Sequence, residues 1–220
     1  MTPKELICHY SQIFHRNGWC PGMSGSIALQ IESSPVRSSV IVTPENIPRD
    51  EIKSGDLFEF RSDYDSQLLI PPARSNEDSP HVIAGFTEIF LHLFSTGTGI
   101  RCAVEICSLP SILAARVALK IWEKNADSFP DRVRLSAFQQ LGAPSEDLII
   151  PVLEIRDVVA LRECLTKEMR RDSKLDAALL KGRGLLVWGN SLPAIKARIE
   201  TLEQLFKLYI SHFGVLSSQI

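Results

Sequence analysis

The spacing of apolar residues predicts helices and short strands along almost the whole chain. Apolar positions three and four residues apart predict amphipathic helices over residues 4–16, 81–94, 111–122, 157–171 and 192–213. Runs of β-branched and apolar residues predict strands at 27–31, 36–43, 56–60, 101–107, 148–152, 177–180 and 185–188. The polar stretch 61–80, rich in proline and serine, is expected to be a surface loop.

The order of these elements favours one fold class. Strands and helices intermix without a strict strand–helix repeat, which favours an antiparallel-rich layered α/β (α+β) domain over a doubly wound parallel sheet. The length of 220 residues fits one domain spanning 1–220. At the first helix, Thr2 is expected to cap the N-terminus, Pro3 to occupy the first position, and Asn17-Gly18 to end it.

Composition and charge narrow the class of protein. Hydrophobic residues make up 45% of the chain and charged residues 23%, which excludes a disordered or fibrous protein. The formal net charge of −2 and the absence of a basic stripe argue against a nucleic-acid partner. No apolar stretch reaches the length of about 18 residues that a membrane span needs. Because no apolar signal-peptide core follows Met1, a cytoplasmic protein is expected.

The five cysteines and five histidines give no sequence signal of a metal site. No C-x-x-C pair occurs, so neither a zinc knuckle nor a redox pair is indicated, and reduced, mostly buried thiols are expected. Four of the histidines fall in predicted helices, and His81 falls at a predicted helix start. A packed or hydrogen-bonded role is expected for each.

Five segments in one order resemble the class II aldolase/adducin family. Its G-H-G and W-G elements correspond to Gly182-Arg183-Gly184 and Trp188-Gly189. Its G-W-x-P-x-x-S-G-N loop, T-P strand end, E-x-x-L-H helix and V-I-P strand correspond to 18–26, 43–44, 88–92 and 149–151. The branch that this chain resembles most is that of the methylthioribulose-1-phosphate dehydratases. The resemblance implies a three-layer fold with a largely antiparallel central sheet flanked by helices, and a homotetramer.

The resemblance also implies a zinc ion on three histidines, but this chain departs from the family at every ligand. The H-x-H pair reads Glu105 and Cys107, and the G-H-G histidine reads Arg183. The acid/base glutamate of the family falls on Gln139, which cannot exchange a proton at neutral pH. Without metal and general acid, the dehydratase mechanism loses its two main contributions, so no cofactor is expected and zinc is predicted to be absent.

Arg183 admits two interpretations. A guanidinium has no lone pair and cannot ligate zinc. It can instead form a salt bridge with Glu105, which would join two segments that a metal joins in the family. Alternatively, Arg183 is an anion receptor. Glu105 and Cys107 could ligate a metal in principle, but two ligands beside a guanidinium make a poor site.

Six residues at family positions for phosphate binding or acid/base chemistry stay candidates. The loop residues Ser24, Gly25 and Ser26, with Thr43 and Thr87, could bind an anion through N–H and hydroxyl groups. The alternative is a plain tight turn, and Glu45, which stands where the family has a small residue, would repel phosphate. Glu88 stands at a catalytic acid position of related aldolases. Without a metal it is interpreted as an ordinary polar residue.

Two functional hypotheses follow. The first is a catalytically degenerate, metal-free homologue of the dehydratases that acts as a binding, scaffold or regulatory protein. Its partners would be copies of itself, a paralogue in a mixed oligomer, or a small anionic metabolite. The alternative is a sugar-phosphate lyase of methionine salvage with a site reorganised around Glu88, Glu105, Cys107 and Arg183, in which Cys107 could be a nucleophile. A dehydratase that is active by simple inheritance is the least favoured.

Overall fold

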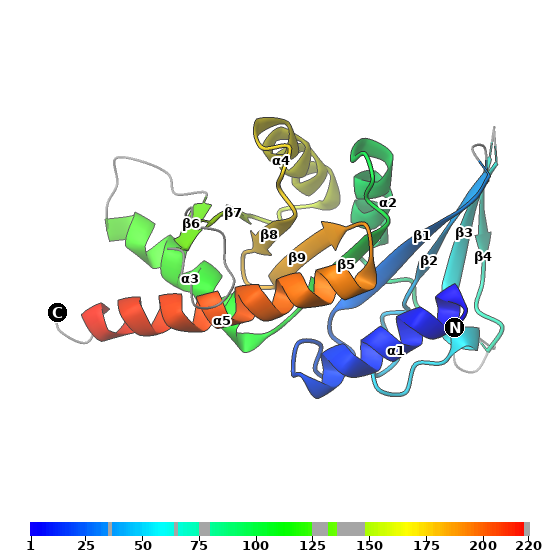
Figure 1. The fold of residues 1–220 in the computed structure, drawn as a ribbon, viewed down its shortest axis with the longest axis horizontal. Helices are drawn as coiled ribbons and strands as arrows, with labels where there is room; N and C mark the ends of the chain where they lie inside the picture. The colour runs from blue at the N-terminus through cyan, green and yellow to red at the C-terminus, as the bar shows by residue number, and fades with distance from the viewer. Residues whose placement is uncertain (35–36, 64–65, 75–79, 125–131, 136–147, 218–220) are drawn as a thin grey trace. The chain divides into compact units, whose positions relative to one another are not determined.

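The chain divides into two compact units. The structure, a computed structural model, describes residues 1–34, 37–63, 66–74, 80–124, 132–135 and 148–217 (Figure 1). These residues form five α-helices and nine strands. Unit 1 contains residues 1–107 and 188–192, and unit 2 contains residues 108–187 and 193–220. The chain passes from unit 1 into unit 2 after Cys107, returns to unit 1 over residues 188–192, and then enters unit 2 a second time.

Unit 1 begins with a helix whose N-terminus is capped as its sequence predicts. Helix α1 spans Pro3–Arg16. The Thr2 hydroxyl accepts a hydrogen bond from the Glu5 backbone N–H, and the Glu5 carboxylate accepts one from the Thr2 backbone N–H. Pro3 occupies the first turn, where its missing N–H leaves no helical bond unmade. The apolar face of α1, including Ile7 and Phe14, packs against β1.

The sheet of unit 1 is antiparallel. Its strands are β1 (Ser26–Ser34), β2 (Arg37–Val42), β3 (Phe58–Asp63), β4 (Ser66–Ile70) and β5 (Cys102–Ile106). They follow the order β4-β3-β2-β1-β5, and each neighbouring pair is antiparallel. A short 3₁₀ helix, η1 (Ser54–Asp56), precedes β3, and helix α2 (Thr87–Thr96) packs against β1 and β5. Strand β5 is buried along its whole length.

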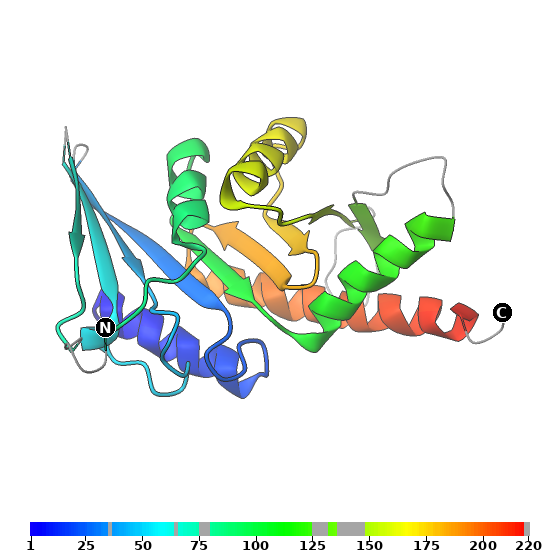
Figure 2. The same cartoon turned by 180° about the vertical axis from the view of Figure 1, so that it is seen from behind.

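Unit 2 combines four strands with three helices. The helices are α3 (Leu109–Lys124), α4 (Val158–Arg171) and α5 (Leu192–Ser217), and the strands are β6 (Arg132–Leu135), β7 (Leu148–Leu153), β8 (Ala177–Leu180) and β9 (Gly184–Gly189). The strand order is β9-β8-β7-β6, with β8–β9 and β6–β7 antiparallel and β7–β8 parallel (Figure 2). The predicted fold class, a layered α/β protein with a largely antiparallel sheet, is confirmed.

The expectation of one long loop over 61–80 was wrong in its first half. Strand β3 continues to Asp63, and β4 pairs with it, so that Ile70 lies opposite Glu59 and Leu69 opposite Phe60. The apolar run Leu68–Ile70 belongs to this strand. The strand was not predicted because this run is short and is followed directly by Pro71-Pro72. Residues 75–79 of the predicted loop lie outside the described residues.

The predicted helix over 81–94 begins six residues later than expected. Residues before Thr87 make tertiary backbone contacts instead of a helical turn: Ile83 forms an isolated bridge with Pro44, and the Val82 carbonyl accepts from the Glu45 N–H at 2.8 Å. His81 therefore lies outside α2. Over so few residues, apolar spacing does not distinguish an extended segment from a first helical turn, because the stretch is too short to show a period of two or of 3.6.

The other helices match their predictions closely, and a second strand, β6, was missed in addition to β4. Asp157 caps α4 by accepting from the Ala160 N–H at 2.8 Å. Strand β6 has four residues, two of them arginines, which is too short and too polar a run to predict a strand. Cys8, Cys20 and Cys102 are buried, Cys107 is half-buried and Cys164 is exposed. Within the described ranges, every helix lacks either the length or the apolar character that a bilayer span requires.

Candidate functional site

Glu105, at the first metal-ligand position of the family pattern, is a buried carboxylate. It lies on β5 opposite Ser26 of β1 and is 2% exposed. The Ser26 hydroxyl donates a hydrogen bond to Glu105 Oε2 at 3.0 Å. Because a buried charge is costly without hydrogen bonds and a nearby cation, the surroundings of this carboxylate decide what it can do.

A buried guanidinium, Arg49, lies within electrostatic reach of Glu105 and Cys107. It is 1% exposed and donates hydrogen bonds to five backbone carbonyls, those of Met23, Ser24, Gly25, Pro44 and Ile47. Burial lowers the pKa of Arg49 from its usual high value, and the neighbouring acidic groups, including Glu105, oppose that shift. Arg49 thus carries positive charge into the centre of the loop 21–26.

Sequence reasoning overlooked Arg49. It follows Ile47-Pro48 and precedes two acidic residues, a context that is typical of an exposed turn. A long side chain can reach backbone carbonyls that are distant in the sequence, so the neighbouring residues carry no signal of its burial. The family segments quoted for this chain stop at Pro44 and resume at Glu88, so none of them includes this position.

Gly25 is the point at which the loop 21–26 passes closest to β5. Its φ of +75° lies in the left-handed region. A Cβ added there would lie 2.4 Å from Cys20 Sγ and 2.8 Å from the Glu105 carbonyl oxygen. The Cys20 thiol donates to that same carbonyl at 3.8 Å, and burial raises the pKa of Cys20. The loop is therefore packed directly onto the backbone of Glu105.

The hydroxyls predicted to bind an anion form hydrogen bonds within the protein. Ser24 Oγ donates to the Pro21 carbonyl at 2.7 Å, and Thr87 Oγ1 donates to the Ala84 carbonyl at 2.7 Å. Thr43 Oγ1 accepts from the Ile27 N–H at 3.1 Å and is fully buried. With Ser26 bonded to Glu105, this arrangement supports the tight-turn interpretation, and anion binding by these residues stays a prediction.

Glu45 and Glu88 lie near the start of α2 in different surroundings. Glu45 Oε2 accepts a hydrogen bond from the Gly85 N–H at 3.1 Å, two residues before Thr87. This carboxylate therefore adds negative charge beside one of the hydroxyls predicted to bind phosphate. Glu88 lies exposed in the first turn of α2, so its expected role as an ordinary polar residue stays a prediction.

The remaining predicted site residues are not brought together within one unit. Cys107 belongs to unit 1, is half-buried, and its N–H donates to the Trp19 carbonyl at 2.8 Å. Arg183 lies exposed in the β8–β9 turn of unit 2, where its N–H donates to the Leu180 carbonyl. The predicted Glu105–Arg183 salt bridge would join the two units and stays a prediction. Gln139 lies outside the described residues.

The donor set does not fit the zinc site that the family pattern implies. Glu105 and Cys107 are two donor types that zinc accepts, but tetrahedral sites use three or four protein ligands. Across the described part of the chain, no three side chains of the types His, Cys, Asp and Glu are gathered as a metal site requires. Arg183, at the third position, has no lone pair to offer.

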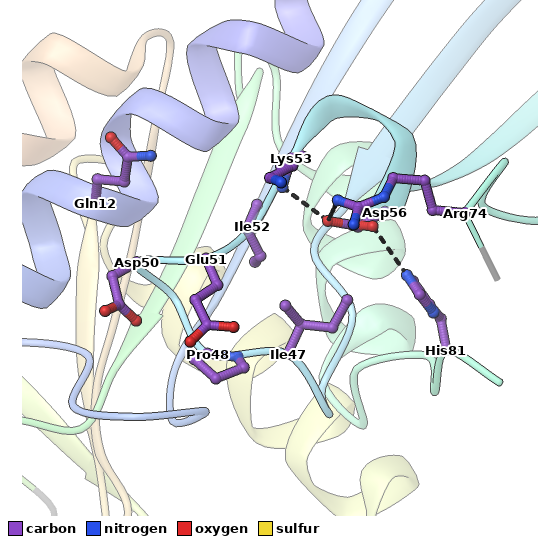
Figure 3. Close-up of a pocket in the computed structure, with 10 residues that line it drawn as sticks. All are labelled: Gln12, Ile47, Pro48, Asp50, Glu51, Ile52, Lys53, Asp56, Arg74 and His81. Carbon is purple, nitrogen blue, oxygen red and sulfur yellow. Dashed lines mark hydrogen bonds and ion pairs between the residues drawn. The ribbon is translucent and has the colours of Figure 1, made fainter. Parts of the chain in front are cut away.

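A second group of charged residues surrounds a pocket in unit 1 (Figure 3). Asp56, which is 2% exposed, accepts from the Lys53 N–H at 2.8 Å, from Arg74 at 3.2 Å and pairs with His81 Nε2 at 3.1 Å. The pocket has a volume of about 640 Å³. No local sequence pattern indicates this pocket, because its lining comes from α1, from residues 47–56, and from Arg74 and His81.

Comparisons with known proteins identify the fold and its relatives. Residues 5–210 match the class II aldolase and adducin N-terminal domain family. A probable methylthioribulose-1-phosphate dehydratase of Acyrthosiphon pisum is 23% identical, covering 94% of this chain and 87% of that protein. A methylthioribulose-1-phosphate dehydratase of Uncinocarpus reesii is 24% identical, covering 94% and 86%.

Solved structures show the same architecture. An L-fuculose 1-phosphate aldolase superposes with a TM-score of 0.70 at 16% identity, covering 96% of this chain and 86% of that one. YgbL, a putative aldolase/epimerase/decarboxylase from Escherichia coli, superposes with a TM-score of 0.66 at 17% identity, covering 93% and 86%. At these identities the likeness shows the fold alone.

Proposed function

The chain belongs to the class II aldolase and adducin N-terminal domain family, and from that premise we propose that it is a metal-free member that acts by binding. Its relatives include proteins named methylthioribulose-1-phosphate dehydratases. In this proposal the chain keeps their fold and has lost the zinc-dependent reaction. It acts as a scaffold or regulatory subunit whose partner is a copy of itself or a paralogue of the same fold.

The observation that carries the proposal is the buried Glu105 carboxylate at a metal-ligand position. Its Oε2 is engaged by Ser26, and Arg49 lies within electrostatic reach of it. A divalent ion placed beside Glu105 and Cys107 would meet the charge of Arg49 and would lack a third protein ligand among the described residues. At about 4 Å, a guanidinium opposes a divalent ion by roughly 8 kcal/mol at an effective dielectric constant of 20.

The surroundings of the loop 21–26 favour a protein partner over a phosphorylated ligand. Ser24, Ser26 and Thr87 each donate their hydroxyl hydrogen to a protein oxygen. Glu45 places a carboxylate at the start of α2. A phosphate arriving there would have to break internal hydrogen bonds and approach negative charge. A small anionic metabolite thus stays the less supported of the proposed partners, and we expect a homo-oligomer.

Elemental analysis of the purified full chain tests the loss of the metal. The wild-type protein, purified without chelator, is expected to hold far less than one zinc per chain. The matched variant Glu105→His/Cys107→His/Arg183→His restores the three imidazoles of the family pattern and is expected to gain zinc. About one metal per wild-type chain would overturn the proposal.

A turnover assay separates the proposal from its alternative. Methylthioribulose 1-phosphate is expected to stay unchanged in the presence of the wild-type chain. Conversion would favour the sugar-phosphate lyase with a site reorganised around Glu88, Glu105, Cys107 and Arg183. Light scattering after size-exclusion chromatography checks the expected homo-oligomer, and a monomer at micromolar concentration would contradict that part.

A further inference from the structure

We propose that the pocket lined by Gln12, residues 47–48 and 50–53, Asp56, Arg74 and His81 binds a small zwitterion, a molecule with one ammonium and one carboxylate group. All of these residues belong to unit 1. None of them is a family metal, acid/base or loop position. The inference therefore stands independently of the proposed function.

The two walls of the pocket carry opposite charge. Figure 3 shows Asp50 and Glu51 on one side and Lys53, Arg74 and His81 around Asp56 on the other. Asp50 and Glu51 are exposed carboxylates that follow one another in the chain. Asp50 lies 3.8 Å from His15 Nε2, and His15 does not line the pocket. The two carboxylates leave this wall acidic, and an ammonium group is the complementary partner for such a wall.

The basic wall is held in place by a buried carboxylate. Asp56, with a side chain 3% exposed, contacts both Arg74 and His81, so one acidic group fixes two basic side chains that are seven residues apart in the sequence. Arg74 uses one of its N–H groups on Asp56 and is about half-exposed, which leaves further donors of its five-donor guanidinium for a ligand carboxylate. Lys53 adds a second permanent cation.

An apolar surface lies between the charged walls. Ile47, Pro48 and Ile52 line the pocket, and Figure 3 shows Ile47 and Ile52 between the acidic pair and the Asp56 group. A methylene chain between the two charged groups of a ligand would cover this surface. The volume of about 640 Å³ accommodates a molecule of the size of an amino acid or a dipeptide. The combination excludes a simple anion or cation as the best ligand, because either would leave one wall uncompensated.

Calorimetric titration of the full chain at low ionic strength tests the proposal with three matched probes. These are 6-aminohexanoate, hexanoate and hexylamine, which share a chain length and differ in their charged groups. The zwitterion is expected to bind about tenfold or more tightly than either singly charged probe. Equal affinity of hexanoate or hexylamine, or no heat from the zwitterion up to about 10 mM, would overturn the proposal.

Variants of each wall test where the zwitterion binds. Glu51→Gln and Lys53→Gln are each expected to weaken binding of 6-aminohexanoate by about two- to fivefold, because a partly exposed ion pair is lost. Glu51→Gln should leave hexanoate binding unchanged. Glu163→Gln, on the exposed face of α4 in unit 2, is the control and should leave all three affinities unchanged. Unchanged zwitterion affinity in both wall variants would contradict the assignment to this pocket.

Discussion

Two buried carboxylates, Glu105 in unit 1 and Glu203 in unit 2, have nearly equal burial and different surroundings. Glu105 is 2% exposed and Glu203 is 3% exposed. Each accepts a hydrogen bond from a serine hydroxyl, Ser26 for Glu105 and Ser108 for Glu203. Glu105 also lies within reach of the buried guanidinium of Arg49. Burial raises the pKa of Glu203, and Ser108 and Lys207 oppose that shift without cancelling it.

The difference shows that burial alone does not determine the role of a carboxylate. A buried ionised group is strongly unfavourable unless a cation and hydrogen bonds compensate it. Around Glu105, one long side chain brings a cation and simultaneously ties together the loop 21–26 and the segment 44–47. Around Glu203, Ser108 and Ser111 form a neutral hydroxyl pair. Arg49 therefore brings a positive charge near Glu105, whereas burial favours the protonated form of Glu203.

Removing the cation is expected to have the largest effect. Arg49→Met leaves five backbone carbonyls without the guanidinium donor, two of them buried, and removes the positive charge near Glu105, so a loss of about 3–5 kcal/mol in the free energy of unfolding is expected. Arg49→Lys retains the charge with fewer donors and should lose less. Urea unfolding followed by circular dichroism measures both. A loss below about 1 kcal/mol for Arg49→Met would contradict the structural role of this residue.

A pair of glycine variants tests how tightly the loop 21–26 packs on β5. Gly25→Ala adds a Cβ that would lie 2.4 Å from Cys20 Sγ, at a φ of +75°, and is expected to lose about 2–4 kcal/mol. Gly22→Ala is the control, because its φ is +59° and a Cβ there meets nothing within 4 Å, so about 1–2 kcal/mol is expected from strain alone. Equal losses in thermal unfolding would show that the loop can move away from β5.

Neutralising the two carboxylates is expected to shift stability in opposite directions. Glu105→Gln replaces an acceptor beside a cation and should lose about 1–3 kcal/mol at pH 7. Glu203→Gln removes a charge from a site that favours the neutral form and should gain about 1 kcal/mol at pH 7. Urea unfolding at pH 7 measures both. A gain in the free energy of unfolding for Glu105→Gln would contradict the proposed difference between the two carboxylates.

The pH dependence of stability in Glu203→Gln tests whether Glu203 is the group whose pKa is raised. Because the folded state binds the Glu203 proton more tightly than the unfolded state, stability falls as pH rises from the unfolded-state pKa of about 4.3 through the raised folded-state pKa. Above that window the wild type bears the full cost of ionisation. The advantage of Glu203→Gln should therefore shrink as pH falls toward about 4. A constant difference between pH 4 and 7 would exclude Glu203 as the titrating group.

Local patterns explain which elements were predictable. Thr2, Pro3 and Glu5 fix the start of α1 through neighbours three residues apart, and Asp157 does the same for α4. These signals were correctly interpreted because the partners are close in sequence. Strand β4 was missed although it pairs with the preceding strand β3, because its apolar run is short and follows a polar stretch. The start of α2 was misplaced because Val82, just before it, bonds Glu45, which lies far away along the chain.

The candidate site divides in the same way. The family pattern marked Glu105, Cys107 and Arg183 as substituted positions, because residue identities can be compared one by one. It could not mark Arg49 or the Asp56 pocket, because their importance lies in which distant groups they contact. The Arg49 guanidinium donates hydrogen bonds to backbone carbonyls of residues 23–25, 44 and 47, and no sequence-spacing rule relates these positions.

The sequence by itself determined the family, the fold class and the loss of the histidine ligands, since each depends on residue types in a fixed order along the chain. Only the tertiary structure decided where charge is compensated. Long side chains such as Arg49 cross between segments, and the free energy of a buried charge depends on the groups around it in space. For this reason Glu105 and Glu203, alike in residue type and burial, are expected to respond differently to the loss of their charge.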